Sequence, residues 1–355
     1  MSDMLSGIEL KQFRSYRDNS FEFGSGVNII VGPNASGKSN LLEAILVLAR
    51  GGSYRVSDAD LIMFKESWAR LDANLQDGST RTFKLKREYE RTTKSYEFDG
   101  KAYARLTHAH TLPVVLFEPN DLLLLHGQPE MRRNYLDDLL EQLEPGYGAT
   151  RKHYRRVLSQ RNALLKRNPS NIETQIFIWN VRLSELGGHI AHKRIELIEE
   201  LKPEIKKLYM SIAKSKTDLS AAYDSQLPFE SYETALLKRL ESSLEKDIIR
   251  GFTTAGPHRD DLVLLFDGVP AAETASRGET RTALLALKIF ELGLLERTRG
   301  QKPLLLLDDV FSELDGKRRH ALTDYLQSYQ TFITTTDADL VLQNFAQTTN
   351  LIALD

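Results

Sequence analysis

The chain has 355 residues, of which 41% are hydrophobic and 27% are charged, and its formal net charge is −2. A chain of this kind can bury a large core, and it has neither an apolar run of about 18 residues nor an N-terminal signal pattern, so neither a membrane span nor secretion is expected. Cysteine is absent, which excludes disulfides and zinc–thiolate sites and is consistent with the cytoplasm. Because the net charge is slightly negative, any nucleic-acid binding must rely on local basic patches.

The first strong pattern along the chain is a phosphate-binding loop. The apolar run 27–31 predicts a strand and the run 40–48 predicts a helix. Between them stand Gly32, Pro33, Asn34, Ala35, Ser36, Gly37, Lys38 and Ser39, which fit the P-loop pattern G-x-x-x-x-G-K-[ST]. In such a loop backbone N–H groups surround a phosphate, the lysine reaches the β- and γ-phosphates, and the serine hydroxyl binds Mg²⁺. A glycine-rich turn that caps a helix would explain neither Lys38 nor Ser39, so we expect a nucleoside triphosphate to bind here.

Residues 130–250 are polar and helix-forming, and they predict an inserted helical lobe. The segment 168–171 is typical of a turn, and the apolar positions from Ile176 to Ile190 recur at helical spacing, so a helix hairpin is expected. Pro203 should kink or end the second helix. An arm of about 20 residues would then be only about 30 Å long.

The first helix of this hairpin carries a basic cluster, because residues 151–167 contain seven lysines and arginines and no acid. Such a run can be a solvated helix face. Seven uncompensated like charges repel one another in the free protein, however, and this favours contact with DNA phosphates. The residues predicted to bind DNA are Arg151, Lys152, Arg155 and Arg156.

A second candidate anion site opens a helix-forming run at residues 276–280. Ser276 and Glu279 fit a capping box, which is a sufficient structural explanation for both residues. Ser276 and Gly278 at a helix N-terminus could also form a second cradle for an anion.

Two carboxylates end the apolar run 302–309. A parallel strand that is buried on both faces has this pattern, and it presents its acids at the carboxyl end, where ligands bind in open α/β sheets. We therefore predict that Asp308 holds Mg²⁺ opposite Ser39. Asp309 would orient or deprotonate the attacking water, with Lys38 as the second catalytic residue. A core strand followed by a polar turn would give the same pattern, and the P-loop in the same chain is what favours the functional interpretation.

The order of these motifs resembles that of the head domain of ABC ATPases. It comprises a P-loop, a long interruption, S-x-G-[QE], four leucines followed by Asp-Asp, S-x-L-D at 312–315, and a polar-ended strand at 332–337. The resemblance extends to the RecF family of recombination mediators over essentially the whole chain. The matching stretches are 10–16, 28–34, 41–45, 132–137 and, most specific to that family, 254–262 (TAGPHRDDL).

This resemblance implies an α/β fold: a P-loop ABC-type ATPase head, with a mixed sheet, helices and an antiparallel β subdomain, into which a helical lobe is inserted. The expected boundaries are 1–129 for the N-terminal part of the head, 130–250 for the lobe, and 251–355 for the C-terminal part of the head.

The resemblance also implies site residues, with ATP and Mg²⁺ as cofactors. Arg14 would reach the nucleotide phosphates, and Ser276 and Gly278 would bind the γ-phosphate held by a partner subunit. Asp315 would belong to the D-loop and Thr336 to the switch strand. The segment 117–121 would be the counterpart of the Q-loop, although it contains no glutamine. His258 and Arg259 would lie near the nucleotide.

The implied function is that of a homodimer, formed on ATP, that binds duplex DNA at gaps and junctions and hydrolyses ATP slowly with stimulation by DNA. Together with RecR and RecO it would help to load RecA in DNA repair, replication and the SOS response. A transport ATPase module and another SMC-like or nuclease head are the alternatives; the basic cluster and the stretch 256–261 favour DNA. Glu279 stands where the signature usually has glutamine, and Arg277 stands where transporter signatures have glycine. The sequence does not assign a contact with nucleotide, DNA or a partner subunit to either residue.

Overall fold

The computed structural model describes residues 4–89, 91–337 and 349–354, and the chain forms two compact units. Unit 1 combines Met1–Asp121 with Leu287–Asp355, and unit 2 is the intervening segment Leu122–Ala286. Among the described residues, no helix combines the length and the apolar character that crossing a bilayer would require.

A five-stranded parallel sheet forms the centre of unit 1, in the order β14-β3-β13-β12-β8. Its strands are β3 (Val27–Val31), β8 (Val114–Phe117), β12 (Leu304–Asp308), β13 (Thr331–Thr335) and β14 (Thr349–Ala353). Every residue of β12 and of β13 is buried, as expected for parallel strands that are covered on both faces.

The antiparallel strands of unit 1 form a separate six-stranded sheet, in the order β2-β1-β4-β5-β6-β7. They are β1 (Leu5–Phe13), β2 (Tyr16–Glu22), β4 (Trp68–Leu75), β5 (Thr80–Glu88), β6 (Arg91–Phe98) and β7 (Lys101–Tyr103). The predicted α/β fold with an antiparallel β subdomain is confirmed, and the two kinds of strand are segregated rather than mixed in one sheet.

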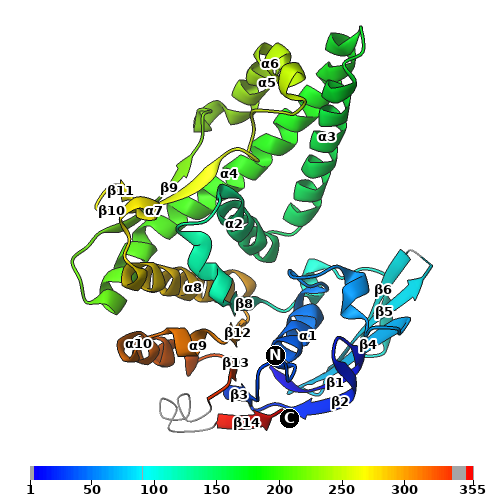
Figure 1. Cartoon of the computed structure of the whole chain (residues 1–355), viewed down its shortest axis with the longest axis vertical. Coiled ribbons are helices and arrows are strands. Elements are labelled where there is room, and N and C mark those ends of the chain that lie inside the picture. Colours follow the sequence, from blue (N-terminus) through cyan, green and yellow to red (C-terminus); the bar gives the residue numbers. More distant parts are fainter. Residues whose placement is uncertain (1–3, 90, 338–348, 355) are drawn as a thin grey trace. The chain divides into compact units, whose positions relative to one another are not determined.

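Helix α1 (Lys38–Arg50) packs against strands of both sheets (Figure 1). All nine residues from Leu41 to Ala49 are buried, and the eight apolar ones share one hydrophobic core with Leu10 and Phe83 of the antiparallel sheet and Leu306 of the parallel sheet. A helix that is apolar on all sides is stable only where it is surrounded. The core of unit 1 therefore holds the helix that begins at the P-loop lysine.

Short elements complete unit 1. The 3₁₀ turns η1 (Asp58–Leu61) and η2 (His108–His110) connect strands, and α9 (Val310–Glu313) and α10 (Gly316–Leu326) follow β12. The turn η3 (Pro119–Leu124) leads out of unit 1, and α8 (Arg277–Arg299) begins in unit 2 and ends in unit 1.

Unit 2 is mainly helical and contains the predicted hairpin. Helix α3 (Tyr147–Arg167) packs along α4 (Ile172–Ala213), and Asn168 takes a left-handed conformation (φ 41°) in the turn between them (Figure 1). The other elements are α2 (Pro129–Leu143), β9 (Leu219–Asp224), η4 (Phe229–Ser231), α5 (Tyr232–Ser242), α6 (Leu244–Arg250), β10 (Asp261–Phe266), β11 (Val269–Pro270) and α7 (Ala271–Thr274).

The second helix of the hairpin is longer than expected. Pro203 lies inside α4, which continues to Ala213 and has 42 residues, or about 63 Å of helix. Of the two predicted effects of Pro203, a kink or an end of the helix, the second is wrong, because the helix continues. Leu201 on one side of the proline and Ile205 and Tyr209 on the other are buried, so tertiary packing offsets the hydrogen bond that proline removes.

The return to unit 1 also comes later than expected, at Leu287 rather than at residue 251. The reason is strand pairing within unit 2. Strand β10 pairs antiparallel with β9 from Asp261↔Asp224 to Phe266↔Leu219, and β11 adds to its other side. Residues 251–286, including the signature Ser276 and Gly278, thus belong to unit 2.

A buried ion pair in unit 2 yields a stability prediction. The Arg161 and Asp247 side chains have no exposed surface, and Arg161 Nη1 lies 2.8 Å from Asp247 Oδ2. Replacing Arg161 with methionine should leave a buried carboxylate without its cation, and we expect the free energy of unfolding to fall by about 3–5 kcal/mol. Urea denaturation in a Trp68→Phe background, in which Trp179 is the remaining tryptophan, measures this loss in unit 2.

The exposed Arg156 on the same helix supplies the control. Arg156→Met should change the free energy of unfolding by no more than about 0.5 kcal/mol. Equal, small losses in both variants would contradict a structural role for the buried pair.

Candidate functional site

The two predicted halves of the site meet at the carboxyl ends of two strands of the parallel sheet in unit 1. The P-loop follows β3 and Asp308 ends β12, with β13 between these strands. Ser39 Oγ donates to Asp308 Oδ1 over 2.9 Å, although the two residues lie 269 positions apart in the sequence. The fold therefore brings together the serine and the carboxylate that were predicted to share a metal ion.

Thr334 of β13 is a site residue that sequence analysis missed. Its Oγ1 donates to Asp308 Oδ1 over 2.8 Å and accepts from the backbone N–H of Asp309 over 2.9 Å. Thr336, which was predicted as the switch residue, is exposed just beyond the strand, and its role stays a prediction. Alternation places Thr334 and Thr336 on the same face, because residues two apart in a strand point to the same side. Only the register of the sheet decides which of them adjoins Asp308, so no sequence signal singled out Thr334.

The loop 32–39 has the geometry of an anion cradle. Gly37 has a φ of 102°, and a Cβ there would lie 2.9 Å from the Tyr16 hydroxyl oxygen. A Cβ at Gly32 would lie 2.6 Å from the carbonyl oxygen of Leu354. Both positions therefore require glycine. Pro33, Asn34 and Ala35 are exposed at the outside of the loop.

Two donors inside this loop suit a phosphate. Lys38 is 9% exposed, and its Nζ donates to the carbonyl oxygens of Gly32 and Pro33 over 2.7 Å. Ser36 Oγ is buried and has no hydrogen-bond partner among the described residues. A buried hydroxyl without a partner is costly, and the oxygens of a phosphate would satisfy both it and the ammonium group. These residues fit the β- and γ-phosphates of a nucleotide.

Arg55 is a third side-chain partner of Asp308, and no sequence pattern indicated it. Arg55 Nη2 lies 2.6 Å from Asp308 Oδ2 and 2.9 Å from Glu118 Oε2, and Glu118 also accepts from the Tyr54 hydroxyl. Burial opposes the charge on Arg55, but its hydrogen bonds to Asp308 and Glu118 outweigh burial and raise the pKa of Arg55. Burial and the bond to Glu118 raise the pKa of Tyr54. Tyr54 and Arg55 belong to the loop between α1 and η1, which has no motif of its own.

The segment predicted as the Q-loop counterpart supplies Glu118. Its backbone N–H donates to Asp121 Oδ2 over 3.0 Å, and Asp121 lies 3.4 Å from Lys288 Nζ on α8. Lys288 is also paired with Glu291, at 3.3 Å. A buried lysine between two carboxylates thus holds this segment in place.

Asp309 follows Asp308 in a strained conformation. Its φ is 54°, in the left-handed region, and the residue is exposed at the start of α9. Non-glycine residues in this region often occur at functional sites. Asp315 caps the N-terminus of α10 by accepting from the backbone N–H of Arg318 over 3.0 Å, which gives it a structural role whatever its part in a D-loop.

Arg14 adjoins the P-loop helix through an ion pair. Its Nε lies 2.8 Å from Glu43 Oε2 of α1, and its φ is 53°. It lines a groove on unit 1 together with Ser15, Asn40, Ile62, Phe64, Lys65, Arg87 and Tyr89. Phe64 is 86% exposed. Arg14 Nη1 also donates to the carbonyl oxygen of Asp60 over 3.2 Å. The guanidinium is therefore held within unit 1 at the edge of this groove, and its contact with nucleotide phosphates stays a prediction.

In unit 2, the capping box at the start of α8 is formed as predicted. Glu279 Oε2 accepts from the backbone N–H of Ser276 over 2.8 Å, and Ser276 Oγ accepts from the backbone N–H of Glu279 over 3.3 Å. The negative charge of Glu279 thus lies at the helix N-terminus, where it interacts favourably with the helix dipole. Arg277 is exposed.

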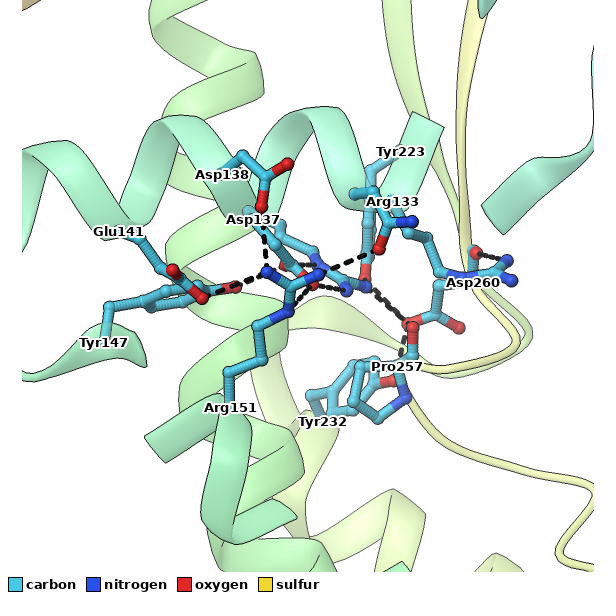
Figure 2. A network of polar contacts seen from close by, with 12 residues as sticks. Arg133, Asp137, Asp138, Glu141, Tyr147, Arg151, Tyr223, Tyr232, Pro257 and Asp260 are labelled. Atoms are coloured by element: carbon cyan, nitrogen blue, oxygen red, sulfur yellow. Dashed lines mark hydrogen bonds and ion pairs between the residues drawn. The ribbon is translucent and has the colours of Figure 1, made fainter. Parts of the chain in front are cut away.

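The structure corrects the prediction for Arg151. Its guanidinium is paired with Asp137 at 2.8 Å and with Asp138 and Glu141 at 3.0 Å, and the residue is 9% exposed (Figure 2). Arg161 of the same basic cluster is buried against Asp247. These two arginines neutralise acids from other elements of unit 2, so neither is available to DNA. Lys152, Arg155 and Arg156 are exposed.

The stretch 254–262 contributes to the same polar network. Arg194 Nη1 donates to the carbonyl oxygen of Pro257 over 2.7 Å and its Nε lies 2.8 Å from Asp137 Oδ1. Asp260 Oδ2 accepts from Tyr223 and Tyr232, and Arg133 Nη1 donates to its carbonyl oxygen (Figure 2). The motifs 132–137 and 254–262 therefore bind each other inside unit 2.

Ionisation in this network follows from burial and pairing. Burial alone would raise the pKa of Asp137, but Arg194 and Arg151 outweigh it and lower that pKa. Burial lowers the pKa of His258 to about 4. His258 contacts the Tyr154 hydroxyl at 2.6 Å and the Thr253 carbonyl oxygen at 3.2 Å, and Arg259 Nη2 donates to the same carbonyl over 3.2 Å. A place for either residue beside a nucleotide stays a prediction.

Comparison with known proteins agrees with this architecture. The chain matches the family described as "RecF/RecN/SMC N terminal domain" over residues 4–353. The DNA replication and repair protein RecF of Heliobacterium modesticaldum is 36% identical over 343 residues, which cover 94% of this chain and 92% of that protein. The solved "Structure of the recombination mediator protein RecF-ATPrS in RecFOR pathway" has a TM-score of 0.88 at 32% identity, with 99% of this chain and 97% of that one covered. This chain therefore belongs to the RecF family.

Proposed function

We propose that this chain is an ATP-dependent DNA-binding protein of recombinational repair. The observation that carries the proposal is the meeting of the P-loop serine with Asp308 at the end of β12, with the Lys38 ammonium inside the loop. A relative of known structure is described as RecF bound to ATP, within the RecFOR pathway. ATP is therefore the nucleotide that we assign to the cradle.

The triphosphate would lie in the loop 32–39, where Lys38 and the backbone N–H groups at the start of α1 neutralise its charge. Ser39 and Asp308 would hold Mg²⁺, which would neutralise charge on the β- and γ-phosphate oxygens. The rest of the nucleotide would extend into the groove beside Arg14, where the exposed ring of Phe64 offers an apolar surface to the base.

Hydrolysis is assigned to Asp309. Its exposed carboxylate follows the metal-binding Asp308 directly, in a strained conformation that Thr334 supports through the backbone N–H. It would orient or deprotonate the attacking water. We propose that turnover is slow and that DNA stimulates it.

Dimerisation on ATP would follow from the placement of the signature. In the capping box, Ser276 Oγ accepts a hydrogen bond from the backbone, so its hydroxyl proton can be donated to a γ-phosphate. We propose that Ser276 and Gly278 bind the γ-phosphate held by the P-loop of a second copy, giving a two-fold dimer with two shared sites. Asp315 and Thr336 are assigned to the D-loop and switch of these sites.

DNA binding is assigned to the exposed face of α3. Lys152, Arg155 and Arg156 are spaced three and four positions apart and share one side of the helix. Contacts to phosphates would let the dimer bind duplex DNA at gaps and junctions without reading its sequence. Action with RecR and RecO to load RecA, in the cytoplasm, is proposed because the relatives are DNA replication and repair proteins and one is described within the RecFOR pathway.

Complementation between two inactive variants tests the shared site. Lys38→Met should abolish ATP binding, and Ser276→Arg should abolish dimerisation while leaving ATP binding by the monomer nearly intact. A mixture of the two should recover part of the ATP hydrolysis, because one of its two sites has both a working P-loop and a working signature. Gel filtration and phosphate release measure the two effects.

Ser276→Asp is the matched control for helix capping, because aspartate is also a good N-cap residue. It should abolish the dimer as well, through repulsion of the γ-phosphate. Loss of ATP affinity in the monomeric Ser276 variants, or no recovery of hydrolysis in the mixture, would contradict action across a dimer.

Asp309→Asn should keep ATP binding and the ATP-bound dimer, since Asp308 remains for the metal. Hydrolysis should slow by about a hundredfold or more, because the water loses its base. Single-turnover hydrolysis with the variant and with the control Asp337→Asn, which alters an exposed carboxylate beyond β13, measures the difference. A normal rate in the Asp309 variant would move the role to another carboxylate.

Charge reversal on the exposed face of α3 tests DNA binding. The triple change of Lys152, Arg155 and Arg156 to glutamate should weaken duplex binding and flatten the log–log salt dependence by about 2 to 3 units, while sparing ATP binding. Arg151→Ala should instead lower the stability of unit 2 and leave the salt slope unchanged. Fluorescence anisotropy with unrelated duplex sequences measures the DNA affinity and the salt slope of both variants. An unchanged slope in the triple variant would contradict the assignment.

A further inference from the structure

The Arg55 guanidinium lies where two carboxylates converge at the candidate metal site of unit 1. One atom, Nη2, is within 2.6 Å of Asp308 Oδ2 and 2.9 Å of Glu118 Oε2. Mg²⁺ prefers oxygen ligands such as those of carboxylates and hydroxyl groups. Ser39 Oγ donates a hydrogen bond to the other oxygen of Asp308, Oδ1. A side-chain cation and a metal ion therefore compete for the same pair of charges.

We propose that Arg55 is a positioning residue that takes the place of the divalent cation between Asp308 and Glu118 in the nucleotide-free protein and leaves it when the cation binds. The inference rests on the proposed function, because it concerns the metal that accompanies ATP. It adds Glu118 to the metal site, and it makes the loop between α1 and η1 the moving part.

The difference in burial indicates which partner moves. The Arg55 side chain is 31% exposed, whereas those of Asp308 and Glu118 are 8% and 12% exposed. An arginine at the surface can return to water at little cost, but a buried carboxylate would lose its cation. Asp308 is also held by Ser39 and Thr334 through Oδ1. The carboxylates thus stay and the arginine leaves.

Glu118 is held independently of Arg55. The hydrogen bond from its backbone N–H to Asp121 and the ion pair of Asp121 with Lys288 fix the segment that carries it. Tyr54 donates to Glu118, and the Arg55 guanidinium carbon lies 5.1 Å from the centre of the Tyr54 ring. The two neighbouring residues therefore close over Glu118 together and are expected to be displaced together.

The consequence is a low affinity for a divalent cation until nucleotide is present. Without nucleotide, a metal ion would have to displace Arg55 using only protein oxygens. With nucleotide, phosphate oxygens add ligands and negative charge. Without a divalent cation, the arginine also neutralises Asp308 and Glu118. It thereby offsets the repulsion between the two adjacent carboxylates.

Titration of the nucleotide-free full chain with Mn²⁺, followed by isothermal calorimetry, tests the exchange. Arg55→Gln removes the charge and retains polar character, and it should bind Mn²⁺ at least about tenfold more tightly than the unaltered chain. Arg70→Gln is the matched control, because Arg70 is paired with Asp72 elsewhere in unit 1, and it should leave the affinity unchanged. The double variant Arg55→Gln/Glu118→Gln should lose the gain.

Equal Mn²⁺ affinity in Arg55→Gln and in the unaltered chain would overturn the proposal, and so would a gain that survives the change of Glu118. These measurements contain no nucleotide. If the chain failed to bind ATP but Arg55→Gln gained Mn²⁺ affinity, the proposed function would fall and the exchange would stand. If the chain bound ATP normally but Arg55→Gln gained no Mn²⁺ affinity, the proposed function would stand and the exchange would fall.

A second measurement leaves the site itself unaltered and so does not depend on the folding of the Arg55 variant. The chain lacks cysteine, so a spin label on Ser57→Cys, an exposed position two residues from Arg55, is specific to this loop. Addition of Mg²⁺ and a non-hydrolysable ATP analogue should increase the mobility of the label. An unchanged spectrum at saturating nucleotide would overturn the proposal.

Discussion

The contact between Ser39 and the Asp308 carboxylate is the interaction on which the proposed nucleotide site of unit 1 depends. It requires three parallel strands in the order β3-β13-β12, because only then do the P-loop and Asp308 lie at one edge, with Thr334 between them. The sheet in turn needs α1, whose apolar sides fill the space between the parallel and antiparallel sheets. The packing of the core therefore also positions the loop that forms the candidate phosphate cradle.

Unit 2 is organised by a different constraint, the pairing of buried charges. Arg161 with Asp247, and Arg151 and Arg194 with Asp137, are ion pairs away from water. Breaking such a pair costs far more than a surface pair, because the remaining charge is left without a partner. The polar stretches 132–137 and 254–262 therefore define the interior of this unit, in addition to any role at its surface.

The same logic accounts for the error at Arg151. Along α3 the buried positions Tyr147, Arg151, Tyr154, Val157, Arg161 and Leu164 follow one another at three- and four-residue intervals. The two arginines are thus in phase with the apolar residues, and helical periodicity could have separated them from Lys152, Arg155 and Arg156. Counting charge along the segment concealed this, because charge says nothing about which side of a helix faces the core.

Features that depend on neighbouring residues could be predicted from the sequence alone: the P-loop between a strand and a helix, the capping box at Ser276 and Glu279, the buried strand ending in Asp308, and the turn after α3. Each is specified by local backbone requirements or by the period of apolar residues. The contacts of Thr334, Arg55 and Glu118 could not be predicted in this way, and neither could the continuation of α4 through Pro203 or the partners of Arg151. These depend on strand register and on charges brought together from distant segments, and a linear pattern carries neither.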